Sequence, residues 1–209
     1  MTNEVTHPTT EILIPTGFLR AALDLAPKND VRFYLNGAYL NNEGFLDVTN
    51  GHYAVRFEIE ELKDLPESVV LTRSQLDFFL KKIQLSGGKE GTTITVDYEA
   101  KTIVLSGANR TGEEQFEQGV FIEANYPDLT RVIYEVNPDS DQLTFQCLNW
   151  DYAALIQKAA RRVNKEAYVE LFPHEKGFSL WSDYVPGMTG TIMPIKRPKK
   201  PVTSAADIV

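Results

Sequence analysis

The stretch EILIPTGFLRAALDLAP, residues 11–27, contains a short apolar strand, a turn and an amphipathic helix. Proline cannot donate the next backbone hydrogen bond of a helix, so Pro27 is expected to end this one. Three segments rich in β-branched and aromatic residues follow, and each is typical of a strand. They are VRFYLNGAYL (31–40), GFLDVTN (44–50) and YAVRFEIE (53–60). The helical face has the 3.6-residue period and consists of Phe18, Leu19, Ala22, Leu23 and Ala26.

The same order begins again at ESVVLTRSQLDFFLKKI, residues 67–83. Thr72 and Gln75 have the spacing of a capping box, in which two side chains bond the free backbone groups at a helix start. One face of this helix is apolar and consists of Leu76, Phe79, Leu80 and Ile83. The expected strands are GTTITVDYE (91–99), KTIVLSG (101–107) and QGVFIEA (118–124), while the acidic segments EIEELKD and TGEEQFE are expected to be loops.

A third copy begins at LTFQCLNWDYAALIQKAARRVNK, residues 143–165. Asn149 can cap a helix whose apolar face is Tyr152, Leu155, Ile156, Ala159 and Val163. The strands AYVELFP (167–173), GFSLWS (177–182) and GTIMPIK (190–196) complete this copy. The sequence therefore predicts a unit of strand, helix and three strands, repeated three times. Such repeats predict an α+β fold with the helices on one face of antiparallel sheets.

The copies also predict the domain organisation. Residues 1–134 would form one complete domain from two units, at about 10–60 and 66–134. Residues 135–197 would form a third unit, or half-domain, after the connector VNPDSDQ. The tail 198–209 is rich in proline and small or polar residues, and we expect it to be disordered.

Composition sets limits on the partners and the compartment. The 209 residues are 43% hydrophobic and 24% charged, which is typical of a globular chain. A net charge of −8 argues against a protein that simply coats nucleic acid, but basic residues can still be concentrated on one surface. The single cysteine, Cys147, excludes an internal disulfide. Neither a signal peptide nor a membrane span is evident, so we expect a cytoplasmic protein.

Basic residues do gather on the third predicted helix. Lys158, Arg161, Arg162 and Lys165 have the spacing i, i+3, i+4 and i+7, which places them on one face. This face could be an ordinary solvated surface, or it could contact DNA phosphates without reading sequence. The first two helices add fewer cations. The candidate DNA-contacting residues are Arg20, Arg32, Tyr34, Arg73, Lys81, Lys82, Lys158, Arg161, Arg162 and Lys165.

Motifs of catalysis and metal binding are missing from the sequence. It has no P-loop, no Gly-x-Ser-x-Gly, no His-Glu-x-x-His and no cysteine pair at metal spacing. The three histidines share no local ligand spacing, and His52 is better explained by a structural or binding role than by general-base catalysis. We therefore expect a protein that is not an enzyme, with no catalytic residues, no metal and no cofactor.

Three segments resemble the bacterial replicative sliding clamp, the beta subunit of DNA polymerase III. They are DVRFYLNGAYL…GFLDVTNGHYAV (30–55), NYPDLTRVIYEVNP (125–138) and GTIMPIKR (190–197), and they occur in the family's order. The resemblance implies a DNA-clamp fold: a homo-oligomeric ring around duplex DNA, with helices lining the hole. It also implies association with the nucleoid or with replication, and partners that include a DNA polymerase, other proteins with clamp-binding peptides, and a clamp loader.

The resemblance further implies a hydrophobic pocket for those peptides. By matching position, the pocket would use Leu35, Thr49, Gly51, His52, Tyr53, Ala54, Pro127, Val132, Thr191 and Met193. Without the resemblance these residues would be interpreted as ordinary strand and core positions. At the pocket rim the family has arginine where this chain has Tyr53, so the preferred peptide can differ.

The number of units departs from the family, whose subunits contain three domains of two units. An unpaired third unit would leave a sheet edge and an apolar helix face for another chain to cover. Four chains of three units would give the twelve units of the family's rings, and a dimer through the third unit is an equal alternative. A different class of function is a decoy or adaptor that binds clamp-interaction motifs without encircling DNA.

Overall fold

The computed structural model describes residues 9–83, 91–109, 111–123, 125–133, 148–174 and 176–195. The first unit is β1 (Thr9–Pro15), α1 (Thr16–Leu25), β2 (Gly37–Asn41), β3 (Phe45–Thr49) and β4 (Tyr53–Glu58). The second is β5 (Val69–Thr72), α2 (Arg73–Ile83), β6 (Gly91–Asp97), β7 (Thr102–Ala108) and β8 (Glu114–Val120). The third contributes α3 (Trp150–Val163), β9 (Glu170–His174), β10 (Gly177–Trp181) and β11 (Thr189–Ile192). Three short 3₁₀ helices are η1 (Phe33–Leu35), η2 (Glu60–Asp64) and η3 (Leu129–Arg131).

The first two units exchange their first strands. β1 pairs with β6 of the second unit, and β5 pairs with β2 of the first unit. The four-stranded sheet therefore has the order β1-β6-β7-β8, and every strand pair in both sheets is antiparallel. Each unit thus supplies one strand to the other unit's sheet, so neither sheet is complete with residues of one unit alone.

The third unit extends the sheet of the first. β11 pairs with β4, which gives a seven-stranded sheet in the order β5-β2-β3-β4-β11-β10-β9. Gly190 lies opposite Val55 in this pairing, and a Cβ atom built on it would be 2.3 Å from the Ala54 carbonyl oxygen. A residue with a side chain would therefore push the two strands apart.

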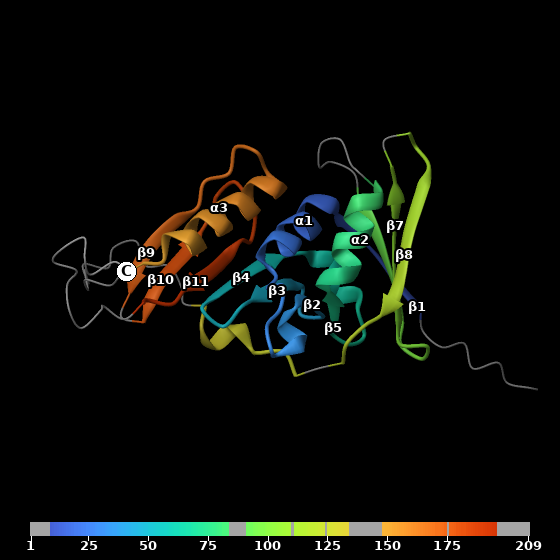
Figure 1. Ribbon diagram of the computed structural model, residues 1–209, viewed down its shortest axis with the longest axis horizontal. Coiled ribbons are helices and arrows are strands. Elements are labelled where there is room, and N and C mark those ends of the chain that lie inside the picture. The colour runs from blue at the N-terminus through green and yellow to red at the C-terminus, as the bar shows by residue number, and fades with distance from the viewer. Residues whose placement is uncertain are drawn as a thin grey trace, which may run out of the picture.

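The helices lie on one face of the sheets, as predicted. Figure 1 shows α3 beside α1 and α1 beside α2, and α1 contacts both of the other helices. A Cβ atom on Gly17 would be 2.8 Å from the Arg162 carbonyl oxygen, so glycine allows α1 and α3 to approach closely. We call the covered side of the sheets the helix face and the opposite side the outer face.

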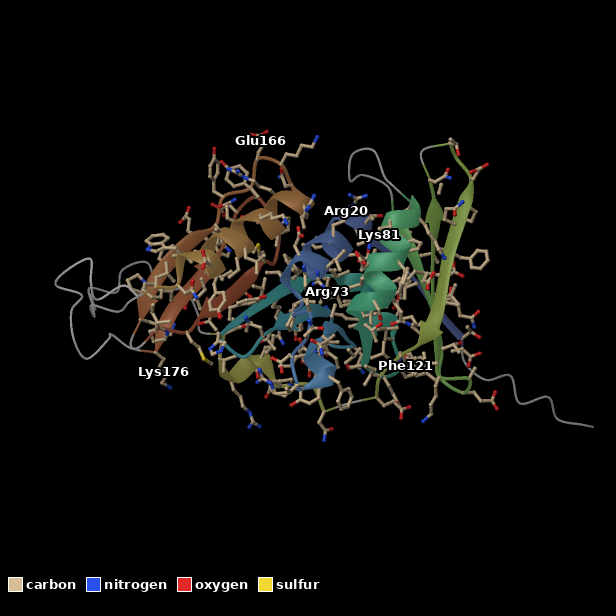
Figure 2. All side chains as sticks on the ribbon, in the orientation of Figure 1. Arg20, Arg73, Lys81, Phe121, Glu166 and Lys176 are labelled. Atoms are coloured by element: carbon tan, nitrogen blue, oxygen red, sulfur yellow. The ribbon has the colours of Figure 1, made fainter. Side chains whose placement is uncertain are left out.

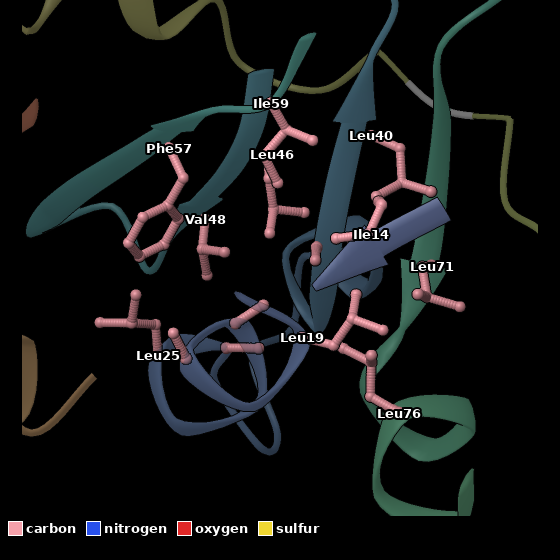
Figure 3. Close-up of a cluster of buried hydrophobic side chains, with 14 of the residues drawn as sticks. Ile14, Leu19, Leu25, Leu40, Leu46, Val48, Phe57, Ile59, Leu71 and Leu76 are labelled. Carbon is pink, nitrogen blue, oxygen red and sulfur yellow. The ribbon is translucent and has the colours of Figure 1, made fainter. Parts of the chain in front are cut away.

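The core fills the space between the helices and the strands. Leu19 and Leu25 of α1, Val48 and Phe57 of the seven-stranded sheet, and Leu76 of α2 are buried in one cluster (Figure 3). Burial of each such side chain contributes about 1.5–3 kcal/mol to the free energy of folding. Because both units supply residues to this cluster, they are expected to unfold together.

The predicted helix starts agree with the structure. The Thr72 hydroxyl accepts from the Gln75 backbone at 3.3 Å, and the Gln75 side chain accepts from the Thr72 backbone at 2.9 Å. Asn149 caps α3 by accepting from the Asp151 backbone at 3.0 Å. α1 ends at Leu25, shortly before Pro27.

Several local predictions are wrong, and one of them is the strand expected over 118–124, because β8 ends at Val120. Residues 33–35 form η1 rather than a strand, so the strand expected over 31–40 begins only at Gly37. The acidic segment expected as a loop contributes Glu114, Gln115, Phe116 and Glu117 to β8, because an edge strand with one exposed face tolerates charges. Lys165 lies beyond the end of α3, where Asn164 already has an extended backbone.

The predicted connector 136–142, the first strand of the third unit and the tail 198–209 lie outside the described residues. In the part of the chain that is described, no helix is both long and apolar enough to cross a membrane.

Candidate functional site

Two of the three cations on α3 bind one carboxylate of α1. Asp24 accepts from Lys158 Nζ at 2.9 Å and from Arg162 Nε at 2.7 Å. Partial burial raises the pKa of Asp24, but the hydrogen bonds from Arg162 and Lys158 outweigh it, so its pKa lies below the usual 3.8. These ion pairs therefore link α3 to α1, and the Asp24 carboxylate neutralises part of the charge of the two cations.

The remaining cations of this region differ in their exposure and in whether they form an ion pair. Within the described residues, Arg161 and Lys165 are exposed and form no ion pair. Arg20, Lys81 and Arg162 line a shallow hollow between the helices, together with Asp24 and Asp77. Figure 2 shows Arg20 and Lys81 close to each other on α1 and α2. The helix face is thus a mixed surface whose most available positive charge lies at the end of α3.

The cations of α2 are held by local partners. Arg73 donates to the backbone oxygens of Leu23 and Ala26, where it satisfies carbonyl groups at the end of α1. Lys81 pairs with Asp77, one turn earlier on the same helix. Lys82 pairs with Glu117 of β8 and also donates to the Phe116 carbonyl at 3.1 Å. Arg73 in particular has a structural role that its position in the sequence did not indicate.

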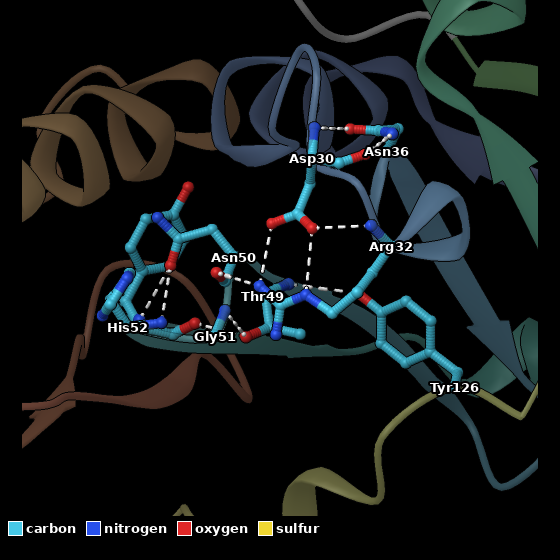
Figure 4. Close-up of polar contacts among 9 residues, drawn as sticks. Asp30, Arg32, Asn36, Thr49, Asn50, Gly51, His52 and Tyr126 are labelled. Atoms are coloured by element: carbon cyan, nitrogen blue, oxygen red, sulfur yellow. Dashed lines mark hydrogen bonds and ion pairs between the residues drawn. The ribbon is translucent and has the colours of Figure 1, made fainter.

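Arg32 and Tyr34 lie away from the helix cations. Arg32 donates to both carboxylate oxygens of Asp30 and to the Asn50 carbonyl at 3.0 Å (Figure 4). The hydrogen bonds from Arg32 lower the pKa of Asp30 to about 2. Tyr34 packs beside Phe33 in a T-shaped contact, near the small apolar cluster around Leu35. The structure therefore places both residues close to the predicted peptide site rather than among the basic helix residues.

The turn between β3 and β4 is fixed by its own polar groups (Figure 4). The Asn50 side chain accepts from the backbones of His52 and Tyr53 at 2.8 and 3.0 Å, and Thr49 Oγ1 accepts from the Gly51 backbone at 3.0 Å. Gly51 has a φ of 84°, in the left-handed region that favours glycine. This turn holds His52 exposed at the surface.

Residues from β11 lie beside this turn. Ala54 is opposite Thr191 in the strand pairing, and the Met193 backbone donates to the His52 carbonyl at 2.8 Å. We call the area formed by the turn and the end of β11 the β4–β11 surface. Its members are Thr49, Gly51, His52, Tyr53, Ala54, Thr191 and Met193. Seven predicted pocket residues are thus adjacent, although they come from positions up to 144 apart in the chain.

Two of the other predicted pocket residues, Pro127 and Val132, lie in the connector 125–133, and the third, Leu35 of η1, packs against it. Tyr126 stacks on Tyr39 with ring centroids 4.7 Å apart, and its hydroxyl accepts from the Thr49 backbone at 3.1 Å. Leu35 belongs to the same apolar cluster as Tyr126. Pro127 follows Tyr126 and is exposed, while Val132 follows η3 and is half-buried. Tyr126 therefore anchors the connector against the β4–β11 surface.

The predicted pocket residues differ in what they can offer a ligand. Leu35, Thr49, Tyr53, Ala54 and Thr191 are buried. The Tyr53 ring packs into the core and its hydroxyl donates to the Leu25 carbonyl, so Tyr53 does not form a rim. The accessible members are His52, Pro127 and Met193, with Gly51 and Val132 half-buried, and Met193 is 41% exposed.

A buried ion pair beside this surface was not predicted. Arg56 donates to both Asp47 oxygens at 2.7 Å, and its guanidinium lies 4.2 Å from the centroid of the Phe45 ring. Asp47 and Arg56 are opposite each other on β3 and β4. Their alternation with the core residues Leu46, Val48, Val55 and Phe57 is the signal that could have placed them on the outer face.

Neither a family model nor a curated protein sequence matches the chain. Solved structures do match. The DNA polymerase III subunit beta of Borrelia burgdorferi has a TM-score of 0.59 at 15% identity, over 94% of this chain and 66% of that one. The pol III beta of Caulobacter crescentus has a TM-score of 0.52 at 17% identity, over 94% and 68%. The DNA polymerase sliding clamp of Bacillus subtilis has a TM-score of 0.50 at 13% identity, over 95% and 67%.

The chain therefore spans about two thirds of the length of these clamps and shares their fold. The fold predicted from the repeated unit is confirmed, since helices cover one face of antiparallel sheets. In the described residues no group of histidine, cysteine and acidic side chains is arranged to hold a metal ion.

Proposed function

We propose that the chain is a compact sliding clamp that encircles duplex DNA as a homo-oligomer and holds a DNA polymerase on it. No bond is made or broken in this function, so the protein acts as a processivity factor and not as an enzyme. Its place of action would be the cytoplasm, at sites of replication, and a clamp loader is a further expected partner.

One observation supports the proposal most strongly: three helices lie side by side on the helix face of sheets that continue from one unit into the next. Such an arrangement can be extended by further units without a change in its geometry. The helices of successive units would then form a continuous lining. Four chains would supply the twelve units found in the rings of the family that the chain resembles.

The interaction with DNA would be electrostatic and independent of sequence. Arg161 and Lys165 are the cations best placed for phosphate contact, because they are exposed and form no ion pair in the described part of the chain. Arg20 and Lys81 would add charge from α1 and α2. Loose contacts of this kind hold DNA within a ring and still permit sliding.

The β4–β11 surface would bind the short peptides of polymerases. An extended peptide could place apolar side chains against Met193 and Pro127 and bond with the polar groups around His52. The turn of this surface contacts both α3, through His52 and Tyr152, and the connector, through Thr49 and Tyr126. His52 stacks on Tyr152 of α3 with ring centroids 6.1 Å apart, so the third unit supports the site as well as extending the sheet.

A second candidate function is an adaptor that binds clamp-interaction motifs without encircling DNA. It is favoured by the number of cations already engaged: Lys158 and Arg162 by Asp24, Lys81 by Asp77, and Lys82 by Glu117. An adaptor would need the β4–β11 surface but not a basic lining.

The two functions can be separated with a double charge reversal, Arg161→Glu with Lys165→Glu. We expect this variant to lose affinity for duplex DNA at low salt, while its affinity for a polymerase tail peptide stays unchanged. The matched control is Lys63→Glu with Lys101→Glu, which reverses two exposed lysines that pair only with local surface acids. Equal DNA affinity of the two double variants would contradict the basic lining and favour the adaptor.

A further inference from the structure

The first two units bury corresponding positions of their helices. Leu19 is the fourth residue of α1 and Leu76 is the fourth residue of α2, and both are fully buried. They belong to one cluster with Ile14 and Leu71, which come from the exchanged strands β1 and β5 (Figure 3). The fourth helical position is therefore where one unit meets the other.

The fourth residue of α3 is Ala153, and it is only partly buried. It lines a hollow with a volume of 390 Å³ between α3 and β9, on the side of α3 away from α1. The other lining residues are Trp150, Ala154, Ile156, Gln157, Val169 and Leu171. At the position where α1 and α2 each meet another unit, α3 instead borders an apolar recess.

α3 is also less covered than its counterparts. Six of the 10 residues of α1 and five of the 11 residues of α2 are buried, but only three of the 14 residues of α3. Those three, Ile156, Ala159 and Ala160, lie in the middle and C-terminal half of the helix. The uncovered part is the N-terminal half, where the indole of Trp150 is 74% exposed.

In the part of the chain that is described, the adjoining sheet also ends beside this recess. Among the described residues β9 is the last strand of the seven-stranded sheet, whereas the corresponding strands β2 and β6 each pair on both sides. An uncovered sheet edge beside an uncovered apolar helix face is what half of a two-unit domain presents.

The chemistry of the recess indicates what fills it. None of the described residues that line it is charged, and the one polar side chain among them, Gln157, donates to the Ala167 carbonyl at 2.7 Å and accepts from the Val169 backbone at 3.0 Å. The recess therefore fits an apolar protein side chain. Trp150, a large aromatic residue, lies next to Ala153 and Ala154, two of the smallest, so the surface offers both a projection and a hollow. A projection beside a hollow is an arrangement that two copies of one surface can fill reciprocally across a two-fold axis.

We propose that a second copy of the chain covers this surface, so that two third units complete one clamp domain across a two-fold axis. Trp150 of each copy packs into the recess beside Ala153 and Ala154 of the other, and α3 packs against α3. The interface is isologous, with the same patch used on both chains. Two chains joined in this way contain six units and leave β8 at both free ends, so two such pairs would account for a twelve-unit ring.

This inference deepens the proposed function by naming the partner of the third unit, and it rests on the proposed function only for ring closure. The first test is cross-linking. In a chain with Cys147→Ser, the Ala153→Cys variant treated with a short bismaleimide should give a covalent dimer, because this position meets itself at the axis. The matched control is Phe78→Cys, on the 57% exposed Phe78 of α2, which should remain a single chain. No dimer from Ala153→Cys, or equal dimer from both variants, would overturn the interface.

A second variant tests the interface with a substitution that should not disturb folding. Trp150→Glu alters a side chain that is already 74% exposed, so the chain should fold normally. Light scattering should then show the particle mass reduced to half, while Phe78→Glu leaves the mass unchanged. A wild-type particle of 23.6 kDa, or a Trp150→Glu particle with the wild-type mass, would overturn the proposal. A dimer that forms but is not retained on circular DNA would instead contradict the proposed function and leave this interface standing.

Discussion

Replacement of Asp24 by asparagine should strengthen the association with DNA while it weakens the protein slightly. Asp24 holds Lys158 at 2.9 Å and Arg162 at 2.7 Å, and its own side chain is 16% exposed. In Asp24→Asn both cations lose their carboxylate partner and become available to phosphates. The substitution should therefore raise the affinity for DNA and lower the free energy of unfolding.

The size of both effects follows from this geometry. Lys158 and Arg162 have side chains that are 57% and 41% exposed, so each pair is screened by solvent. Such pairs contribute about 0.2–1 kcal/mol each, so the variant should lose about 1 kcal/mol of unfolding free energy. Each additional phosphate contact changes the slope of log K against log salt concentration by about −0.9, so two freed cations should steepen it by about 1.8.

The assay is a salt titration of binding to duplex DNA, with Asp128→Asn as the control. Both substitutions change the net charge from −8 to −7, but Asp128 lies in the connector, where it caps η3. The control should leave the slope unchanged. A slope in Asp24→Asn that matches wild type or is shallower would refute the idea that Lys158 and Arg162 face DNA.

Three further predictions concern the core, the buried ion pair and the peptide surface, and a fourth concerns pH. Leu76→Ala should cost about 2–5 kcal/mol in urea unfolding because Leu76 is fully buried, whereas Phe78→Ala should cost under about 1 kcal/mol; equal losses would contradict the shared core. Arg56→Met should cost about 3–5 kcal/mol by leaving Asp47 charged and buried, and Asp47→Leu in addition should restore part of the loss; no rescue would show that the pair is not the cause. Met193→Glu should weaken binding of an apolar polymerase tail peptide at least about tenfold in calorimetry, while Met188→Leu, in the core, should not; unchanged affinity would place the peptide elsewhere. Because the folded pKa of Asp24 lies below 3.8, its ion pairs should stabilise the fold fully above that pH and lose their effect as the pH falls further, and Asp24→Asn should remove this part of the acid dependence.

Much of the fold could be predicted from local patterns. The capping box at Thr72 and Gln75, the cap at Asn149 and the proline after α1 are short-range signals, and the structure contains all three features. The exchange of β1 and β5 could not be predicted, because it depends on pairings between residues such as Ile12 and Ile94 that no local pattern encodes. The edge position of β8 was missed for the same reason.

The candidate site was less accessible to sequence reasoning. Helical spacing placed Lys158, Arg161 and Arg162 on one face, but it gave no sign that Asp24 of another helix would bind two of them. The role of Arg73 at the end of α1 likewise depends on the packing of α1 against α2. Charge on one helix face is a local property, whereas its availability depends on every element packed beside it.

The most direct test of the central claim is retention on DNA that differs only in topology. The assembled protein is bound to a closed circular duplex, passed through a gel filtration column in salt high enough to remove electrostatic binding, and compared before and after a single cut by a restriction enzyme. A clamp that encircles DNA should stay with the circle and be lost from the linear form. Retention that is the same on both forms, or absent from both, would contradict the account.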